Sequence, residues 1–416
     1  MTGDQYLTGL TLYFIGYVLF EIPCNIILKR TTPRLWLPTI TLFWGIVATL
    51  LGVVQNYAGY LTSRFFLGVT ESGLFPGVVF YLSMWYKRNE QHYRISLFFS
   101  AASLAGAFGG ILAWGIGHMK GVGGYNGWRW IFILEGLLTV VVSVLAYFFV
   151  HNYPSTAEFL TEEEREYIQF RLKYDNDATR DESFTWAAVL TAFKDPKVWL
   201  YGLGFHTVSL PLYTLSLFLP SIISGLGYSN ASAQLLTVPP YAVAFILVVV
   251  VAVYSEKTHL RAPFIMGSSA LGIIGYIILL STHSSGSSYV GTIFAAAGIY
   301  PSTAIVLSWP ANNVSGQTKR AVANAMQISI GNLGAVMGTQ LYRSEWSPRY
   351  FVGHSLALAY LAANIAVTGT LWLVLSRENE KKAEIRRTQN IASLEEVGAA
   401  DGEFLGDDDP RWVFQT

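Results

Sequence analysis

The chain has 416 residues, of which 52% are hydrophobic and only 13% are charged. An ordinary soluble domain carries about 25% charged residues, so this composition excludes that class. The 27 Lys and Arg balance the 27 Asp and Glu, which excludes a general basic surface for nucleic acid, and the single cysteine excludes an intramolecular disulfide. The composition predicts an integral membrane protein.

Eleven apolar stretches are each long enough to cross a bilayer as a helix. A bilayer core of about 30 Å needs about 20 mostly apolar residues in helical form. In chain order the stretches cover 7–28, 36–54, 58–84, 94–117, 129–150, 198–223, 233–254, 262–282, 288–310, 320–341 and 352–375. We therefore predict an all-α integral membrane protein.

A polar segment at 151–196 divides these spans unequally. Five spans lie in 1–150, six lie in 197–376, and a charged tail over 377–416 is expected to be loosely ordered. Many transporters consist of two similar six-helix halves with the substrate site at their interface. Five plus six spans is the pattern of such a bundle without its first helix, so we expect this chain to begin inside a longer parent.

Lys and Arg concentrate in one alternating set of loops. This set is predicted to lie in the cytoplasm, together with the central segment and the tail. It contains Lys29, Arg30, Arg34, Lys87, Arg88, Arg94, Lys257, Arg261, Lys319 and Arg320. Within the central segment, the capping-box spacing of Thr161 and Glu164 predicts the start of a surface helix. The sequon Asn230-Ala-Ser232 falls on the outer side, which makes Asn230 a glycosylation candidate.

Two charged residues in the third apolar stretch are the main candidates for function. A charged group at membrane depth is costly unless it is paired or hydrated. Arg64 and Glu71 are seven residues apart, or two helical turns, so they share one face. Their axial separation of about 10 Å is too long for a direct pair. We expect Arg64 to bind an anionic substrate and Glu71 to carry a coupling proton. The alternative is that Arg64 is a structural charge of the bundle.

Three further charged residues are weaker candidates for function. Glu21, just before Pro23, is a second candidate for proton coupling, although it could instead brace the basic inner loop. Glu135 and Arg129 are expected to be structural charges, with Glu135 pairing with a basic residue across the bundle.

Four polar residues of the second half are candidates for substrate binding. They are His206, Asn324, Gln327 and Asn332. Amides can donate to a carboxylate or accept from a ring nitrogen. Interhelical hydrogen bonding explains the three amides equally well, and packing explains the histidine.

Six sequence runs carry a family resemblance. They are Phe20-Glu-Ile-Pro-Cys-Asn25, Arg64-Phe-Phe-Leu-Gly-Val-Thr-Glu-Ser-Gly-Leu-Phe-Pro-Gly77, Gly127-Trp-Arg-Trp-Ile-Phe-Ile-Leu-Glu-Gly136, Arg320-Ala-Val-Ala-Asn-Ala-Met-Gln-Ile-Ser-Ile-Gly-Asn-Leu-Gly334, Gln340-Leu-Tyr-Arg343 and Ser347-Pro-Arg-Tyr350. Together they resemble the fungal allantoate/nicotinate permease branch of the anion:cation symporters, within the major facilitator superfamily.

The resemblance implies a bundle of two six-helix halves that transports small organic anions such as allantoate, nicotinate, pantothenate or biotin. It also implies a fungal plasma-membrane protein, with substrate-binding and proton-coupling roles for Arg64 and Glu71. Relatives carry an Asp-Arg pair in a preceding helix, for which this chain has no counterpart upstream of Asp4. The expected partners are a small organic anion, protons and membrane lipid, and we expect a monomer that binds no nucleic acid.

The sequence lacks the common enzyme signatures. It contains no His-Glu-x-x-His, no Gly-x-Ser-x-Gly and no phosphate loop ending in Gly-Lys-Ser/Thr. We therefore expect no enzyme activity, no cofactor and no metal. The alternative to a proton-coupled importer is a nutrient sensor or an inactive truncated member of the same family.

Overall fold

The computed structural model describes residues 2–173, 186–389, 393 and 406–416. The first group of helices comprises α1 (Gly3–Arg30), α2 (Pro33–Gly52), α3 (Tyr57–Glu71), α4 (Leu74–Trp85), α5 (Arg88–Gly117) and α6 (Gly127–Phe149). The central segment forms α7 (Glu162–Lys173) and α8 (Trp186–Lys194). The second group comprises α9 (Pro196–Gly225), α10 (Asn230–Leu235), α11 (Val238–Thr258), α12 (Ala262–Ser281), α13 (Ser285–Asn313), α14 (Gln317–Gly338) and α15 (Phe351–Gln389). Short 3-10 turns cover Val122–Gly124, Pro154–Thr156, Ser344–Trp346 and Gly406–Asp408.

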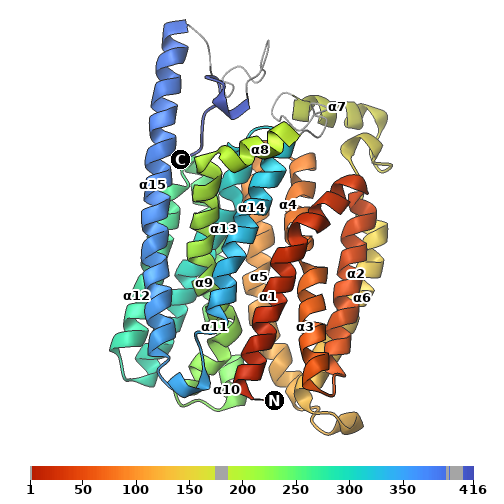
Figure 1. The fold of residues 1–416 in the computed structure, drawn as a ribbon, viewed down its shortest axis with the longest axis vertical. Helices are drawn as coiled ribbons and strands as arrows, with labels where there is room; N and C mark the ends of the chain where they lie inside the picture. Colours follow the sequence, from red (N-terminus) through yellow and green to blue (C-terminus); the bar gives the residue numbers. More distant parts are fainter. Residues whose placement is uncertain (1, 174–185, 390–392, 394–405) are drawn as a thin grey trace.

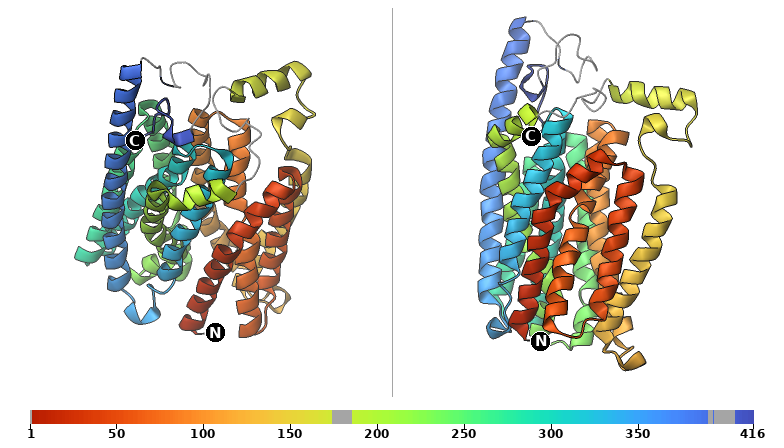
Figure 2. Two further views of the ribbon diagram at one scale, coloured as in Figure 1. Left: turned by 45° about the horizontal axis from the view of Figure 1, so that its top comes forward. Right: turned by 45° about the vertical axis from the view of Figure 1, so that its right-hand side comes forward.

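The long helices stand side by side in one bundle, with the first group on one side and the second group on the other (Figures 1 and 2). Ten of the described helical stretches are long and apolar enough to cross a membrane. The helix α14 occupies the remaining predicted stretch, 320–341, but it carries several amide and hydroxyl side chains and is not among these ten. The prediction of an all-α membrane bundle is confirmed.

Two of the predicted spans are interrupted rather than continuous. The stretch 58–84 forms α3 and α4, with a break at Ser72 and Gly73. Pro76 explains this break, because it has no N–H to donate to the carbonyl four residues earlier. The stretch 233–254 forms α10 and α11, which are separated just before Pro239 and Pro240. Irregular backbone of this kind is tolerated at membrane depth where it is buried in protein or lines a cavity.

Glycine brings the backbones of α1 and α3 into contact. A Cβ atom added to Gly68 would lie 1.9 Å from the carbonyl oxygen of Tyr13, and one added to Gly16 would lie 2.5 Å from that of Phe65. Such close approach is a common use of small residues between membrane helices. It fixes the face of α1 that carries Tyr13 against the face of α3 that carries Arg64 and Glu71.

The surface helix of the central segment begins as predicted. The Thr161 N–H donates to the Glu164 carboxylate at 2.9 Å, and the Glu164 N–H donates to the Thr161 hydroxyl at 3.3 Å. These reciprocal bonds form a capping box at the start of α7. The hydrogen bonds from Thr161 also lower the pKa of the Glu164 carboxyl, because they favour its charged form.

The prediction of a loosely ordered tail is wrong for the part of the tail that the structure describes. The helix α15 continues through 377–389, and residues 406–416 fold back onto the second group. Trp412 and Phe414 are only 4% and 2% exposed. Charge-rich composition indicated disorder, but these two aromatic side chains bury enough apolar surface to order the segment.

Candidate functional site

A cavity of about 410 Å³ lies between helices of the first group and α9 of the second. The first group contributes residues of α1, α2, α3 and α6. The lining is largely aromatic and aliphatic, with a few polar groups among the rings, as is typical of small-molecule sites. It consists of Leu10, Tyr13, Phe14, Trp44, Ala48, Arg64, Leu67, Glu71, Phe132, Glu135, Gly136, Thr139, Tyr213, Ser216 and Leu217.

Arg64 is the only basic residue in this lining, and it is held mainly by aromatic rings. Its guanidinium carbon lies 5.4 Å from the ring centre of Tyr60 and 5.6 Å from that of Phe132. Both distances are within the range of cation–π attraction. The Nε atom is buried and has no hydrogen-bond partner among the described residues. A buried, unpaired donor on a cation favours binding of an anionic ligand.

Glu71 lies at the end of α3, where the span is broken. Its carboxyl group interacts with the Tyr13 hydroxyl on α1 and with the charge of Arg64. The structure places Arg64 and Glu71 in one cavity, in line with their spacing on one helical face. Tyr13 was not among the predicted residues, because an aromatic residue in an apolar helix cannot be told from core by sequence. Its proximity to Glu71 depends on the close packing of α1 on α3 at Gly68.

The two expected structural charges differ in their surroundings. The Arg129 guanidinium donates to the carbonyl oxygens of Gly52 and Val54 at 3.3 and 2.6 Å. It therefore satisfies carbonyls at the end of α2, where a cation is favoured by the helix dipole. Glu135 instead lines the cavity, and the described part of the chain shows no ion pair for it. The expected pairing across the bundle is thus not seen.

Glu21 lies outside this cavity, at a contact between the two helix groups. It is fully buried, and its carboxylate accepts a hydrogen bond from the Ser329 hydroxyl of α14 at 3.2 Å. Its second oxygen, Oε1, has no partner among the residues that the structure describes.

The amide candidates on α14 do not line the cavity. The Gln327 amide donates to the carbonyl oxygen of Val306 at 2.7 Å. That carbonyl needs a side-chain donor because Pro310, four residues later, has no N–H. Gln327 therefore has a structural explanation. Asn332 is 1% exposed and its amide has no partner among the described residues, whereas Asn324 is half-buried with an unpaired oxygen.

His206 is also held within the second group rather than in the cavity. Its Nδ1 atom lies 3.0 Å from the Ile330 carbonyl oxygen, and its Nε2 atom lies 3.5 Å from the Tyr360 hydroxyl. These contacts agree with a packing role. Of the five residues predicted to bind substrate, only Arg64 reaches the cavity.

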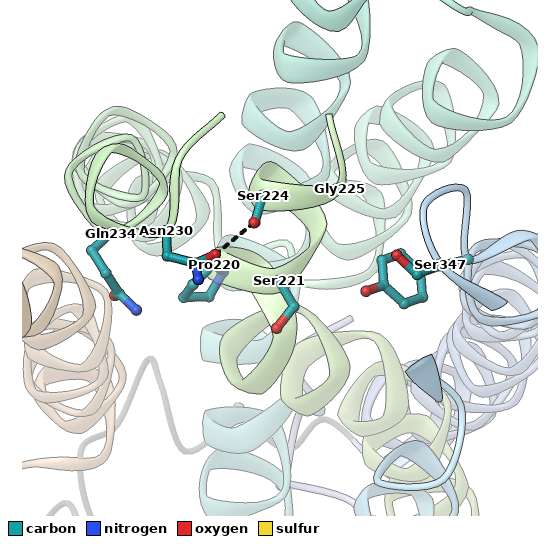
Figure 3. Close-up of a pocket in the computed structure, with 8 residues that line it drawn as sticks. Pro220, Ser221, Ser224, Gly225, Asn230, Gln234 and Ser347 are labelled. Carbon is teal, nitrogen blue, oxygen red and sulfur yellow. Dashed lines mark hydrogen bonds between the residues drawn. The ribbon is translucent and has the colours of Figure 1, made fainter. Parts of the chain in front are cut away.

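Asn230 lies at a second pocket of about 510 Å³, at the end of the bundle that carries the N-terminus (Figures 1 and 3). Its side-chain oxygen accepts a hydrogen bond from the Ser224 hydroxyl at 2.8 Å. The lining is rich in hydroxyl and amide groups and was not predicted from the sequence. It comprises Pro220, Ser221, Ser224, Gly225, Asn230, Gln234, Ser347 and Tyr350.

Comparison with known proteins gives consistent results. The family model described as "Major Facilitator Superfamily" matches residues 1–339. The chain is 37% identical over 417 residues to an MFS-type transporter, cnsO, of Penicillium expansum. That alignment covers 96% of this chain and 80% of the relative. It is 33% identical over 385 residues to a high-affinity nicotinic acid transporter of Saccharomyces cerevisiae, which covers 92% of this chain and 72% of the relative.

Solved structures show the same fold at low sequence identity. The proton:xylose symporter XylE, bound to a bromodeoxyglucose, superimposes with a TM-score of 0.66 at 15% identity over 89% of this chain and 85% of that one. A variant of the E. coli fucose:proton symporter FucP gives a TM-score of 0.63 at 14% identity over 88% and 91% of the two chains.

Proposed function

The chain belongs to the major facilitator superfamily, and on this premise we propose that it imports small organic anions together with protons. Transport would proceed by alternating access, with the two helix groups rocking around the cavity between them. We place it in the plasma membrane with its basic loops and its tail in the cytoplasm, following the distribution of Lys and Arg.

The observation that carries this proposal is the single cation of the cavity. Arg64 has a buried Nε donor without a partner in the part of the chain that the structure describes, and it lines a space walled by aromatic rings. A carboxylate can accept charge-assisted hydrogen bonds from a guanidinium. The rings of Trp44, Phe132 and Tyr213 favour a planar or partly apolar body attached to that carboxylate. Nicotinate is the first compound to test, because one relative is named as a nicotinic acid transporter.

Charge balance in the cavity supports proton coupling. One guanidinium stands beside two carboxyl groups, those of Glu71 and Glu135. An incoming carboxylate adds another negative charge, and protonation of Glu71 would remove one. Binding of the anion and binding of the proton are then thermodynamically linked, each favouring the other. We assign the proton to Glu71 rather than Glu21, because Glu71 shares the cavity with Arg64.

The direct test is Arg64→Gln, with uptake of labelled nicotinate, allantoate, pantothenate and biotin measured in yeast cells. Loss of a charge-assisted hydrogen bond costs about 1.5–3 kcal/mol, so apparent affinity should fall roughly ten- to hundredfold. Arg30→Gln is the matched control, because Arg30 is exposed at the end of α1 and should leave uptake unchanged. Surface expression is quantified for both variants. Normal uptake by well-expressed Arg64→Gln protein would refute the proposed role.

The relatives are named as transporters, which does not favour the alternative of a nutrient sensor. The two functions are separated by measuring binding and uptake on the same protein. A transporter shows both. Binding of an anion without uptake in any direction would instead indicate a sensor.

A further inference from the structure

We propose that the second helix group carries a peptide-binding groove at its basic end, that residues 406–416 occupy this groove, and that the docked segment clamps the helix ends together. The basic end is the end of the bundle opposite the N-terminus, where α11 ends and α12 and α14 begin (Figure 1). Lys257, Arg261 and Lys319 belong to these helix ends. This proposal is independent of the proposed transport function.

Two asparagine side chains recognise the main chain of the segment. The Asn379 amide donates to the Phe414 carbonyl oxygen, and its oxygen accepts from the Phe414 N–H, both at 2.8 Å. Asn313 makes the same pair of bonds with Gln415, again both at 2.8 Å. Each asparagine thus binds both main-chain groups of one residue, much as a residue of a neighbouring strand would. Paired contacts of this kind recognise extended backbone, which is the usual basis of peptide binding along an edge.

Aromatic side chains anchor the segment in the groove. Phe414 is 2% exposed, and its ring centre lies 4.1 Å from the Lys382 ammonium nitrogen and 4.9 Å from that of Lys197. A ring placed between two ammonium groups reduces the cost of keeping both cations close together. Trp412, two residues earlier, is 4% exposed. Both side chains are part of the buried hydrophobic core.

Buried charges fix the two ends of the segment. At one end the Asp407 carboxylate lies 2.7 Å from the Lys319 ammonium nitrogen, which also lies 2.8 Å from the carboxylate of Asp195. Burial raises the pKa of the Asp407 carboxyl, and the Lys319 ammonium opposes that shift. At the other end the fully buried Arg261 guanidinium donates to the Gln415 side-chain oxygen at 2.8 Å.

The groove is built for an occupant, because its polar lining depends on the segment for partners. Without residues 406–416, the Asn313 side-chain oxygen and the Trp309 indole N–H, which donates to Gln415 at 2.8 Å, would lose the bonds that satisfy them. Buried polar groups without partners are costly. The contacts also join separate elements: α9 through Lys197, the start of α12 through Arg261, α13 through Trp309 and Asn313, α14 through Lys319, and α15 through Asn379 and Lys382.

The chemistry of the groove defines its ligand. The lining matches a peptide that begins with acidic residues in a turn, continues with aromatic residues two positions apart and ends with an amide side chain. The docked segment, with Asp407, Trp412, Phe414 and Gln415, has this order. Because the contacts reach five long helices of the second group, the docked segment should hold the ends of these helices together as one body.

Hydrogen exchange on the full chain in lipid nanodiscs tests the proposal. The amide protons of Phe414 and Gln415 should exchange slowly, because they donate to the half-buried Asn379 and the buried Asn313 respectively. Phe414→Ala changes only the segment and leaves the helices intact. It should speed exchange at Gln415 by roughly tenfold or more, and should also speed exchange at the start of α12.

A second test replaces a residue of the groove instead of one in the segment. Asn313→Leu should release the same amides, whereas Asn126→Leu is the matched control, because Asn126 is exposed near the opposite end and makes no capping bond. Fast exchange at 414 and 415 in the unaltered protein would contradict the proposal that the segment is docked in the groove. Release of the segment by Phe414→Ala without faster exchange at the start of α12 would overturn the clamp.

Discussion

Replacing Gly68 by alanine should damage the cavity without replacing any polar side chain. Gly68 lies on α3 between Arg64 and Glu71, where an added Cβ would be 1.9 Å from the Tyr13 carbonyl oxygen and 2.9 Å from the Tyr17 nitrogen. Both obstacles are backbone atoms, so no side chain can rotate away. The axes of α1 and α3 must separate by about 1 Å to restore an ordinary contact, because the packed interior offers no spare space.

The expected effect has two parts that can be measured separately. Overpacking of this kind costs about 1–3 kcal/mol, so the midpoint of thermal unfolding in detergent should fall. A displacement of about 1 Å in a binding constellation can reduce function by roughly a hundredfold, so anion uptake should fall more than expression does. Separation of α1 from α3 moves Tyr13 away from Glu71, which is the structural cause of both effects.

The control is Gly369→Ala in α15, where an added Cβ meets nothing within 4 Å. This variant should unfold at or slightly above the temperature of the parent, since alanine favours helix over glycine by about 1 kcal/mol. Parental stability and uptake in Gly68→Ala would refute the close α1–α3 contact as the element that positions the site.

Two further predictions concern polar groups that hold the bundle. Gln327→Leu leaves the Val306 carbonyl without its donor and should destabilise the protein by about 1–3 kcal/mol in thermal unfolding, with unchanged substrate preference. Altered selectivity in that variant would show that Gln327 contacts substrate after all. Arg129→Gln removes the cation from the carbonyls of Gly52 and Val54 and should cost about 1 kcal/mol of stability. An unchanged unfolding midpoint would show that this contact contributes little.

The apolar stretches predicted the long helices, because membrane spans are set mainly by length and hydropathy. Their interruptions were harder to see. The break at Ser72 and Gly73 follows from Pro76, but many membrane helices contain proline and remain continuous, so the residue alone does not decide the matter. A Cβ atom added to Gly73 would lie only 2.8 Å from the Cβ atom of Cys24. Glycine at the break therefore allows α1 to approach closely at this point.

The sequence predicted only those residues of the candidate site that lie together on one helix. The spacing of Arg64 and Glu71 places them on one face, and the structure finds them in one cavity. Tyr13 and Tyr213 reach the same cavity from other helices, and no pattern within one helix identifies such neighbours. Gln327 was predicted to bind substrate, but its amide donates to the Val306 carbonyl oxygen instead. That carbonyl lacks its usual helical donor because of a proline on α13.

The tail illustrates why composition can mislead about order. Its aspartates and glycines are typical of flexible segments. Several partners that order residues 406–416 are distant in the sequence: Asn313 lies 102 positions and Arg261 lies 154 positions from Gln415. Such long-range pairing of backbone with buried side chains leaves no local signal.

The most direct measurement of the central claim uses purified protein in liposomes with an acidic exterior and labelled nicotinate, then the other three anions. We expect one of them to accumulate, and a protonophore to abolish the accumulation. Glu71→Gln should lose accumulation but retain exchange of internal for external anion, because an amide cannot carry the proton yet still fills the site. No proton-driven accumulation of any of the four anions, or undiminished accumulation by Glu71→Gln, would contradict the account.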